Sequence, residues 1–161
     1  MRFAGRALFL VQQIMRIKIV SVGKPALAYT RDGIGLYTTR LRPYTKLDIH
    51  HAKPAPREKL EPRLLDLTTS TFRVVLDERG KTPTTSQFAQ KLAEWRDDPA
   101  VKTVSFIVGG SDGHSQNLRS KADFLFALSP LTLQHELAQL LLLEQVYRAF
   151  TILHDHPYHR T

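Results

Sequence analysis

The chain has 161 residues, which suffices for one domain with a hydrophobic core, and its 42% hydrophobic and 24% charged residues are typical of a globular protein. Lysine and arginine number 23 against 15 acidic residues, so the net charge of +8 and the isoelectric point near 10.0 favour a polyanionic partner: RNA, DNA or an anionic surface. Cysteine is absent, which excludes disulfides and thiolate chemistry and fits a cytoplasmic protein, and no apolar run reaches the roughly 18 residues of a membrane span.

Residues 1–14 differ in character from the rest of the chain. Two arginines and a short apolar stretch resemble a signal peptide superficially, but the apolar part is short and no small-residue cleavage site comes after it. Met15 stands directly before residues 17–22, which alternate like a strand and stop at a glycine. We therefore expect an N-terminal extension over 1–14 and a single domain over 15–161.

Strand-like and helix-like segments alternate through that domain. The runs rich in Val, Ile and Phe, which favour strands, are 17–22, 47–51, 72–76, 104–108 and 124–128. Helical patterns occupy about 27–41, 57–69, 86–96 and 133–153. This alternation predicts an α/β fold, a mainly parallel sheet with helices on both faces, and ligands bind such sheets beyond the carboxyl ends of the strands.

Three strand ends are therefore candidate ligand sites. The third strand ends at Leu76 before a charged turn, and the fourth is followed by Gly109-Gly110. Paired glycines let a ligand approach the backbone closely, although they also occur as simple tight turns, and their spacing fits neither a dinucleotide fingerprint nor a P-loop. The fifth strand runs into an uncharged apolar loop at 128–133, where a connection is normally polar. This loop either lines a pocket or belongs to the core.

The long last helix is apolar on more than one side. Its apolar residues fall into two stripes, one of Leu137, Leu140, Leu141 and Phe150 and one of Leu142, Val146, Ala149 and Leu153. One stripe can pack on the sheet, and leaving the other in water is costly. A second copy of the chain is the simplest partner; another helix of the same chain is the alternative.

The chain ends in His156-Pro157-Tyr158-His159-Arg160-Thr161, whose side chains titrate near neutrality, stack on bases and bind phosphate. The tail is therefore a candidate for half of an active site, against the alternative of a frayed terminus. The neighbouring histidines suggest zinc, but no thiolate or further ligand cluster accompanies them, so we expect no metal. His114, alone in a loop, is expected to be structural or solvated rather than catalytic.

These segments together resemble one family. The residues that carry the resemblance are Leu76-Asp77, Gly109-Gly110-Ser111-x-Gly113, Leu128-Ser129-x-Leu131-Thr132-Leu133, Tyr147-Arg148-Ala149 and His156-Pro157-Tyr158-His159-Arg160. In order and spacing they are similar to the RlmH-type (YbeA-like) large-subunit rRNA methyltransferases of the SPOUT class, over about residues 15–161. The resemblance implies a homodimer with a C-terminal trefoil knot, which no periodicity reveals. It also implies methylation of N3 of a pseudouridine in 23S rRNA of the large ribosomal subunit or 70S ribosome, with S-adenosyl-L-methionine as cofactor.

The resemblance also assigns residues to roles. Those expected to hold S-adenosylmethionine are Leu76, Gly110, Leu128, Ser129, Pro130, Leu131, Thr132 and Leu133. Pro130 departs from the family pattern and removes a backbone donor, so a hydrogen bond there is not expected. In the tail, His159 is either the base for the N3 proton or orients the target while water takes that proton. Arg160 would hold phosphate or developing negative charge, and Tyr158 would stack on or hydrogen-bond the target base.

In the family, one subunit's tail completes a site whose cofactor lies in the other subunit. Two other functions remain open from the sequence: a methyltransferase of the same fold acting on tRNA, and a non-catalytic basic RNA-binding protein. Neither DNA nor a membrane is expected as a partner.

Overall fold

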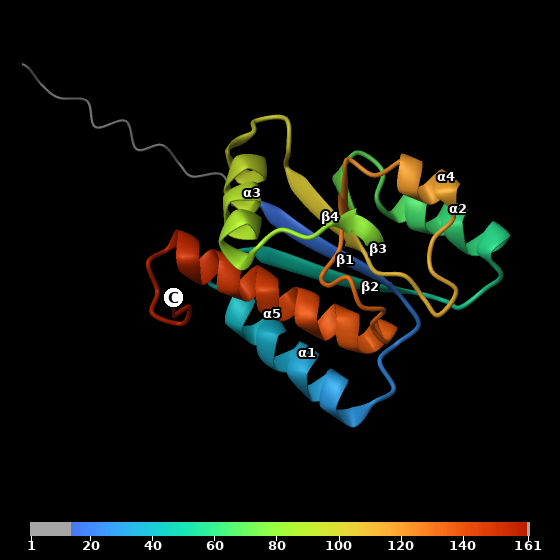
Figure 1. Cartoon of the computed structure of the whole chain (residues 1–161), viewed down its shortest axis with the longest axis horizontal. Coiled ribbons are helices and arrows are strands. Elements are labelled where there is room, and N and C mark those ends of the chain that lie inside the picture. The colour runs from blue at the N-terminus through green and yellow to red at the C-terminus, as the bar shows by residue number, and fades with distance from the viewer. Residues whose placement is uncertain (1–13, 161) are drawn as a thin grey trace, which may run out of the picture.

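The structure, a computed structural model, describes residues 14–160. Its elements alternate along the chain (Figure 1): β1 Arg16–Val22, α1 Ala28–Leu41, β2 Lys46–Ala52, α2 Arg57–Leu67, β3 Phe72–Lys81, α3 Thr85–Asp97, β4 Thr103–Ile107, α4 Gln116–Ser120, β5 Phe124–Phe126 and α5 His135–Leu153. The strands and helices expected from the sequence are thus confirmed. The short helix α4 was not predicted, because five residues are too few to show a helical period; Ser115 starts it by accepting a hydrogen bond from the Leu118 N–H.

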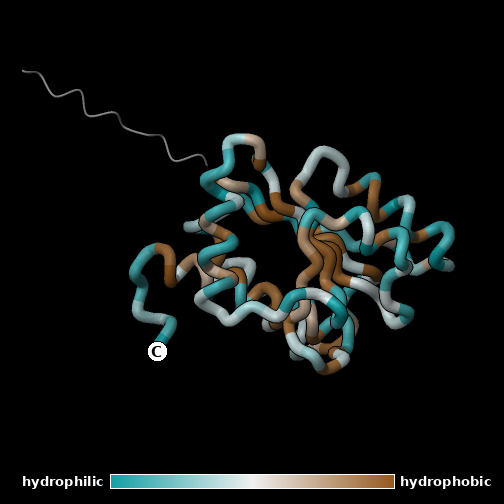
Figure 2. The backbone as a smooth tube through the Cα atoms, turned by 45° about the horizontal axis from the view of Figure 1, so that its top comes forward, coloured by the Kyte–Doolittle hydropathy of each residue, from teal (hydrophilic) through white to brown (hydrophobic). Residues whose placement is uncertain are grey.

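The five strands form one parallel sheet in the order β2-β1-β4-β3-β5, which confirms the predicted α/β class. Side chains of β1 alternate between two cores. Ile17 and Ile19 pack with α1, α3 and α5, whereas Val20 faces α2 and α4. Figure 2 shows the hydrophobic strands enclosed by segments that carry most of the hydrophilic residues. Helices therefore cover both faces, and Ile17, Ile19 and Val20 are fully buried because of it.

Strand β3 is longer than predicted. The charged segment 77–80 was expected to be a turn after the strand, but β3 continues through a register shift between Leu76 and Lys81. The shift brings Lys81 opposite Phe126. Gly80 permits this contact, because a Cβ there would lie 2.7 Å from the carbonyl of Leu125. The chain thus bulges outward at 77–80.

Helix α5 packs between α1 and α3 (Figure 1). One expected stripe is confirmed at Leu142, Val146 and Ala149, which are fully buried, while its last member, Leu153, is half-buried. Phe150 was assigned to the other stripe, and this was wrong: it is buried and stacks on Tyr44 with ring centroids 5.8 Å apart. At about 100° per residue, Phe150 turns toward the side of Val146 rather than that of Leu137 and Leu141. The remaining leucines of the other stripe are half-buried or exposed.

The expected start of the domain lies at the edge of the described residues. Met15 is buried, and the Thr45 hydroxyl donates a hydrogen bond to its carbonyl. Residues 1–13 of the expected N-terminal extension lie outside the described part of the chain. Among residues 14–160, no helix has both the length and the apolar character required to cross a bilayer.

Candidate active site

A cavity of about 820 Å³ opens at the carboxyl ends of the neighbouring strands β4, β3 and β5. Three segments line it: 76–79 from the bulge of β3, 108–116 after β4, and 126–135 around the start of α5 (with gaps). Its position is where open parallel sheets bind ligands, and its volume suits a small molecule.

The glycine-rich loop after β4 folds back on itself. Gly113 has φ +63°, and its N–H donates to the carbonyl of Gly110 at 3.2 Å. His114 then packs under Gly109 so closely that a Cβ on Gly109 would lie 3.0 Å from the His114 Nε2. Burial lowers the pKa of His114, and its Nε2 has no hydrogen-bond partner among the described residues. His114 is therefore buried in the wall of the cavity, where a structural role was expected for it.

Ionic and hydrogen-bonding contacts hold the same loop from both sides. The carboxylate of Glu61 accepts hydrogen bonds from the N–H and the hydroxyl of Ser115. The Arg119 guanidinium lies 3.4 Å from the Asp77 carboxylate, and both side chains are largely buried. Asp77 therefore lines the cavity, and its negative charge is paired with the positive charge of Arg119.

The apolar loop after β5 lines the cavity rather than the core. Leu131 is 74% exposed, and its N–H donates to the Ser129 hydroxyl. The Thr132 hydroxyl donates to Glu78 at 2.7 Å and so ties the loop to the bulge of β3. Every residue predicted to hold the cofactor lines this cavity except Pro130.

Glu136, which sequence analysis missed, fixes the first turn of α5 beside the cavity. Its carboxylate accepts hydrogen bonds from the N–H groups of Ala26 and Leu27 and from the Thr30 hydroxyl, at 2.7–3.0 Å. These bonds lower the pKa of Glu136 from 4.5 to about 2. Helix α1 has no capping side chain at Leu27, and Glu136 binds the two N–H groups directly before the helix and the Thr30 hydroxyl in its first turn, across more than a hundred residues of sequence.

The tail forms a second cluster, around Tyr158. The phenol donates to Glu144 Oε1 at 3.0 Å and lies 3.2 Å from the Tyr37 hydroxyl. The Arg148 guanidinium stands over the Tyr158 ring, 4.7 Å from its centroid, and the Tyr147 ring meets it edge-on at 4.7 Å. Burial and these hydrogen bonds raise the pKa of Tyr158, so the phenol remains protonated and acts as a donor.

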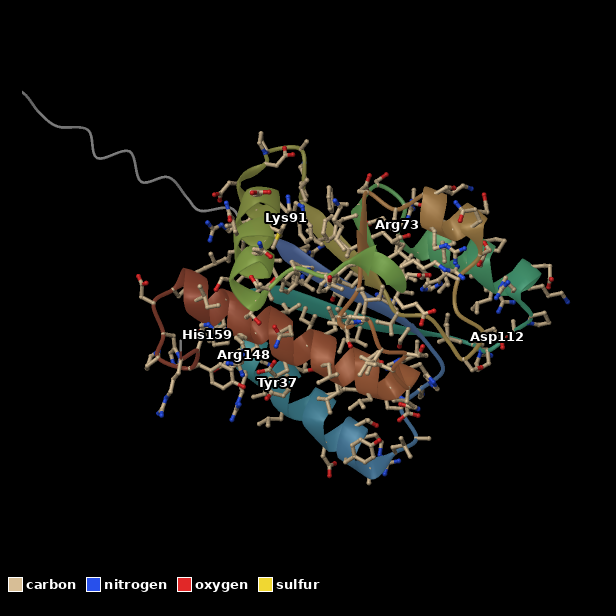
Figure 3. All side chains as sticks on the ribbon, viewed as in Figure 1. Tyr37, Arg73, Lys91, Asp112, Arg148 and His159 are labelled. Carbon is tan, nitrogen blue, oxygen red and sulfur yellow. The ribbon has the colours of Figure 1, made fainter. Side chains whose placement is uncertain are left out.

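His159 and Arg160 come directly after this anchored tyrosine. Arg148 donates through Nε and Nη2 to Glu144 Oε1, and its Nη1 lies 3.4 Å from His159 Nδ1 (Figure 3). Arg160 is exposed. Sequence analysis missed Glu144 and Tyr37; the spacing of Glu144 and Arg148, four residues apart on a helix, was the available indication of an ion pair.

The cavity lies at the start of α5, whereas the tail follows the end of this helix and folds back onto Glu144 and Arg148. The helix begins at His135 beside the cavity and ends at Leu153 before the tail, a span of about 27 Å at 1.5 Å per residue. Figure 3 shows His159 and Asp112 on opposite sides of the molecule. Within one chain, the predicted cofactor residues therefore form one cluster and the predicted tail residues form another. The two clusters do not contact each other.

No group of three or more His, Cys, Asp or Glu side chains that could hold a metal ion occurs among residues 14–160. His154, at the end of α5, has its Nδ1 2.8 Å from the carbonyl of Phe150.

Comparison with known proteins first gives the class. A family model described as "Predicted SPOUT methyltransferase" matches residues 15–159. The chain is 44% identical over 146 residues to ribosomal RNA large subunit methyltransferase H of Thermus thermophilus, and 39% identical over 150 residues to the protein of that name from Deinococcus radiodurans; each match covers 91% of this chain and 99% of the relative. A probable methyltransferase from Bordetella pertussis Tohama I shares the fold, with a TM-score of 0.56 at 13% identity over 86% of this chain and 96% of that one. The chain therefore belongs to the SPOUT methyltransferases, in the family of ribosomal RNA large subunit methyltransferase H.

Proposed function

We propose that this protein methylates N3 of a pseudouridine in 23S rRNA, with S-adenosylmethionine as methyl donor. The relatives from Thermus and Deinococcus are named as methyltransferases of large-subunit ribosomal RNA. The observation that carries the proposal is the cavity at the ends of β4, β3 and β5, lined by an uncharged apolar loop and by Gly109-Gly110. The net charge of +8 supports an RNA substrate.

The residues around the cavity fit S-adenosylmethionine. Leu76, Leu128 and Leu133 offer apolar surface for an adenine, and Gly110 contributes backbone to the cavity wall. The cofactor supplies a methyl group on a positively charged sulfur. The protein's task is then to align N3 of the target behind that methyl group, and such positioning supplies much of the rate.

The separation of cavity and tail supports a shared site in a homodimer. The tail contacts Tyr37, Glu144 and Arg148, none of which lines the cavity, whereas a two-fold partner running antiparallel along α5 would bring the tail of one subunit to the cavity of the other. Tyr29, Leu36 and Leu141 on α1 and α5 are exposed and provide apolar surface for this contact. The family also implies that the chain is threaded into a trefoil knot, and the close passage of Gly80 over Leu125 suits a crossing there.

Labelled S-adenosylmethionine, offered with ribosomes, free 23S rRNA or tRNA, tests the activity. We expect the label on N3 of a pseudouridine in 23S rRNA after mapping the modified nucleotide. Label on tRNA would favour the alternative enzyme, and a lack of saturable cofactor binding in calorimetry would favour a non-catalytic RNA-binding protein.

Mixed dimers test the shared site. One subunit lacks residues 156–161 and the other carries Gly110→Val, which we expect to weaken cofactor binding, as calorimetry on the Gly110→Val homodimer verifies. If tails act across the interface, the mixed dimer has one complete site and keeps measurable activity, while each homodimer has none. Inactivity of correctly assembled mixed dimers, with cofactor still bound to the tail-deleted subunit, would contradict the shared site.

A further inference from the structure

The contact between Arg148 and His159 determines which ring nitrogen of His159 carries its proton. A guanidinium has N–H donors and no acceptor. Its Nη1 lies within hydrogen-bonding distance, 3.4 Å, of His159 Nδ1. Nδ1 must therefore be the acceptor and carry no proton, so the neutral ring has its proton on Nε2.

Arg148 is itself held in place, so this tautomer is built into the structure. Its Nε and Nη2 both bond Glu144 Oε1, and its plane stands over the Tyr158 ring. Tyr158 in turn donates to the same carboxylate, and its hydroxyl contacts that of Tyr37. Contacts to α1 and α5 thus fix the guanidinium and leave Nη1 for the histidine.

We propose that His159 acts in methyl transfer as a hydrogen-bond donor through Nε2–H to a carbonyl oxygen of the target base, and that it does not remove the N3 proton; Arg148 is the positioning residue that sets this tautomer. The proposal rests on the methyltransferase function proposed for the chain. A neutral imidazole whose Nδ1 lone pair is occupied and whose Nε2 already bears a proton has no free site for another.

The chemistry balances without a protein base. N3 of the imide bonds to the methyl carbon, the carbon–sulfur bond breaks with its electron pair going to sulfur, and the N3 proton passes to solvent water. As that proton leaves, negative charge spreads to the two carbonyl oxygens beside N3. A preorganised donor at one of them stabilises the charge as an oxyanion hole does.

Amide substitutions at position 159 distinguish a hydrogen-bond donor role of His159 from a role as a base. His159→Gln places an amide N–H near the position of Nε2, His159→Asn places its amide near Nδ1, and neither can act as a base. Turnover is measured on unmethylated ribosomes with labelled S-adenosylmethionine. We expect His159→Gln to stay within about tenfold of the unaltered protein, and His159→Asn and His159→Ala to fall about 10²–10³-fold, the cost of one oxyanion donor. A His159→Gln protein as slow as His159→Ala, with dimer and cofactor affinity intact, would overturn the proposal.

Nitrogen-15 NMR of the histidine side chains decides the tautomer without any turnover. We expect the His159 ring to carry its proton on Nε2, and the Nδ1 resonance to shift in Arg148→Gln, where the donor is altered. A proton on Nδ1, or an Nδ1 resonance indifferent to Arg148→Gln, would refute the assignment. Because this measurement needs no RNA, a protein inactive on every RNA would reject the proposed function while the spectrum still decides the role of Arg148.

Discussion

Removing the Tyr158 hydroxyl should separate an anchoring role for this residue from stacking on the target base. Tyr158→Phe keeps the ring under Arg148 and against Tyr147 but loses the bonds to Glu144 and Tyr37. A hydrogen bond to a charged group contributes about 1.5–3 kcal/mol, and the half-buried position favours the lower value. The bond between the neutral hydroxyls of Tyr158 and Tyr37 adds about 1 kcal/mol, so the loss is about 2.5 kcal/mol. At about 1.4 kcal/mol per factor of ten, docking of the tail weakens about 60-fold.

The assay is steady-state methyl transfer together with calorimetric cofactor binding. We expect kcat/KM for RNA to fall about 60-fold, while the cofactor Kd is unchanged because Tyr37, Glu144 and Arg148, which Tyr158 contacts, do not line the cavity. Tyr37→Phe is the matched control: it removes a bond between neutral groups, worth about 1 kcal/mol, and keeps the one to Glu144, so it should cost less. Full activity of Tyr158→Phe would refute the anchor, since a stacking role needs the ring alone.

Four further outcomes are expected. The Glu136 carboxylate, whose pKa falls from 4.5 to about 2, stabilises the fold above pH 4.5, and this contribution disappears as the pH falls through about 2; Glu136→Gln should therefore be less stable than the unaltered protein in urea at pH 7, with the difference shrinking below pH 4.5. Gly80→Ala places a methyl group 2.7 Å from backbone atoms and should cost about 1–3 kcal/mol in urea unfolding, whereas Gly35→Ala, with nothing within 4 Å in helix α1, should gain about 0.5–1 kcal/mol; equal effects would contradict the close passage. A protein that begins at Met15 should keep its circular dichroism and methyl transfer, and loss of either would make residues 1–14 part of the working domain. RNA affinity should fall steeply with salt in filter binding while cofactor affinity changes little; a flat response for RNA would argue against phosphate contacts.

Local sequence patterns were sufficient to predict most of the strands and helices. The predicted strands and the longer helices are all present. A buried strand or a buried helix face leaves a recognisable pattern of apolar residues along the sequence, and this pattern predicted them. The loop at 128–133 was recognised as unusual for the same reason: an apolar connection departs from local expectation. Its place in a cavity wall rather than in the core required the fold, and Leu131 is the clearest instance.

The sequence by itself determined the β/α order, the basic character and the residues of the tail, since each depends on neighbours along the chain. Only the tertiary structure decided the strand order, the continuation of β3 past Leu76, and the partners of Tyr158 and Arg148. Tyr37 contacts Tyr158 across 121 residues of sequence, and Glu136 accepts a hydrogen bond from the Leu27 N–H across 109. Such contacts arise when packing brings distant elements together, and no local periodicity records them.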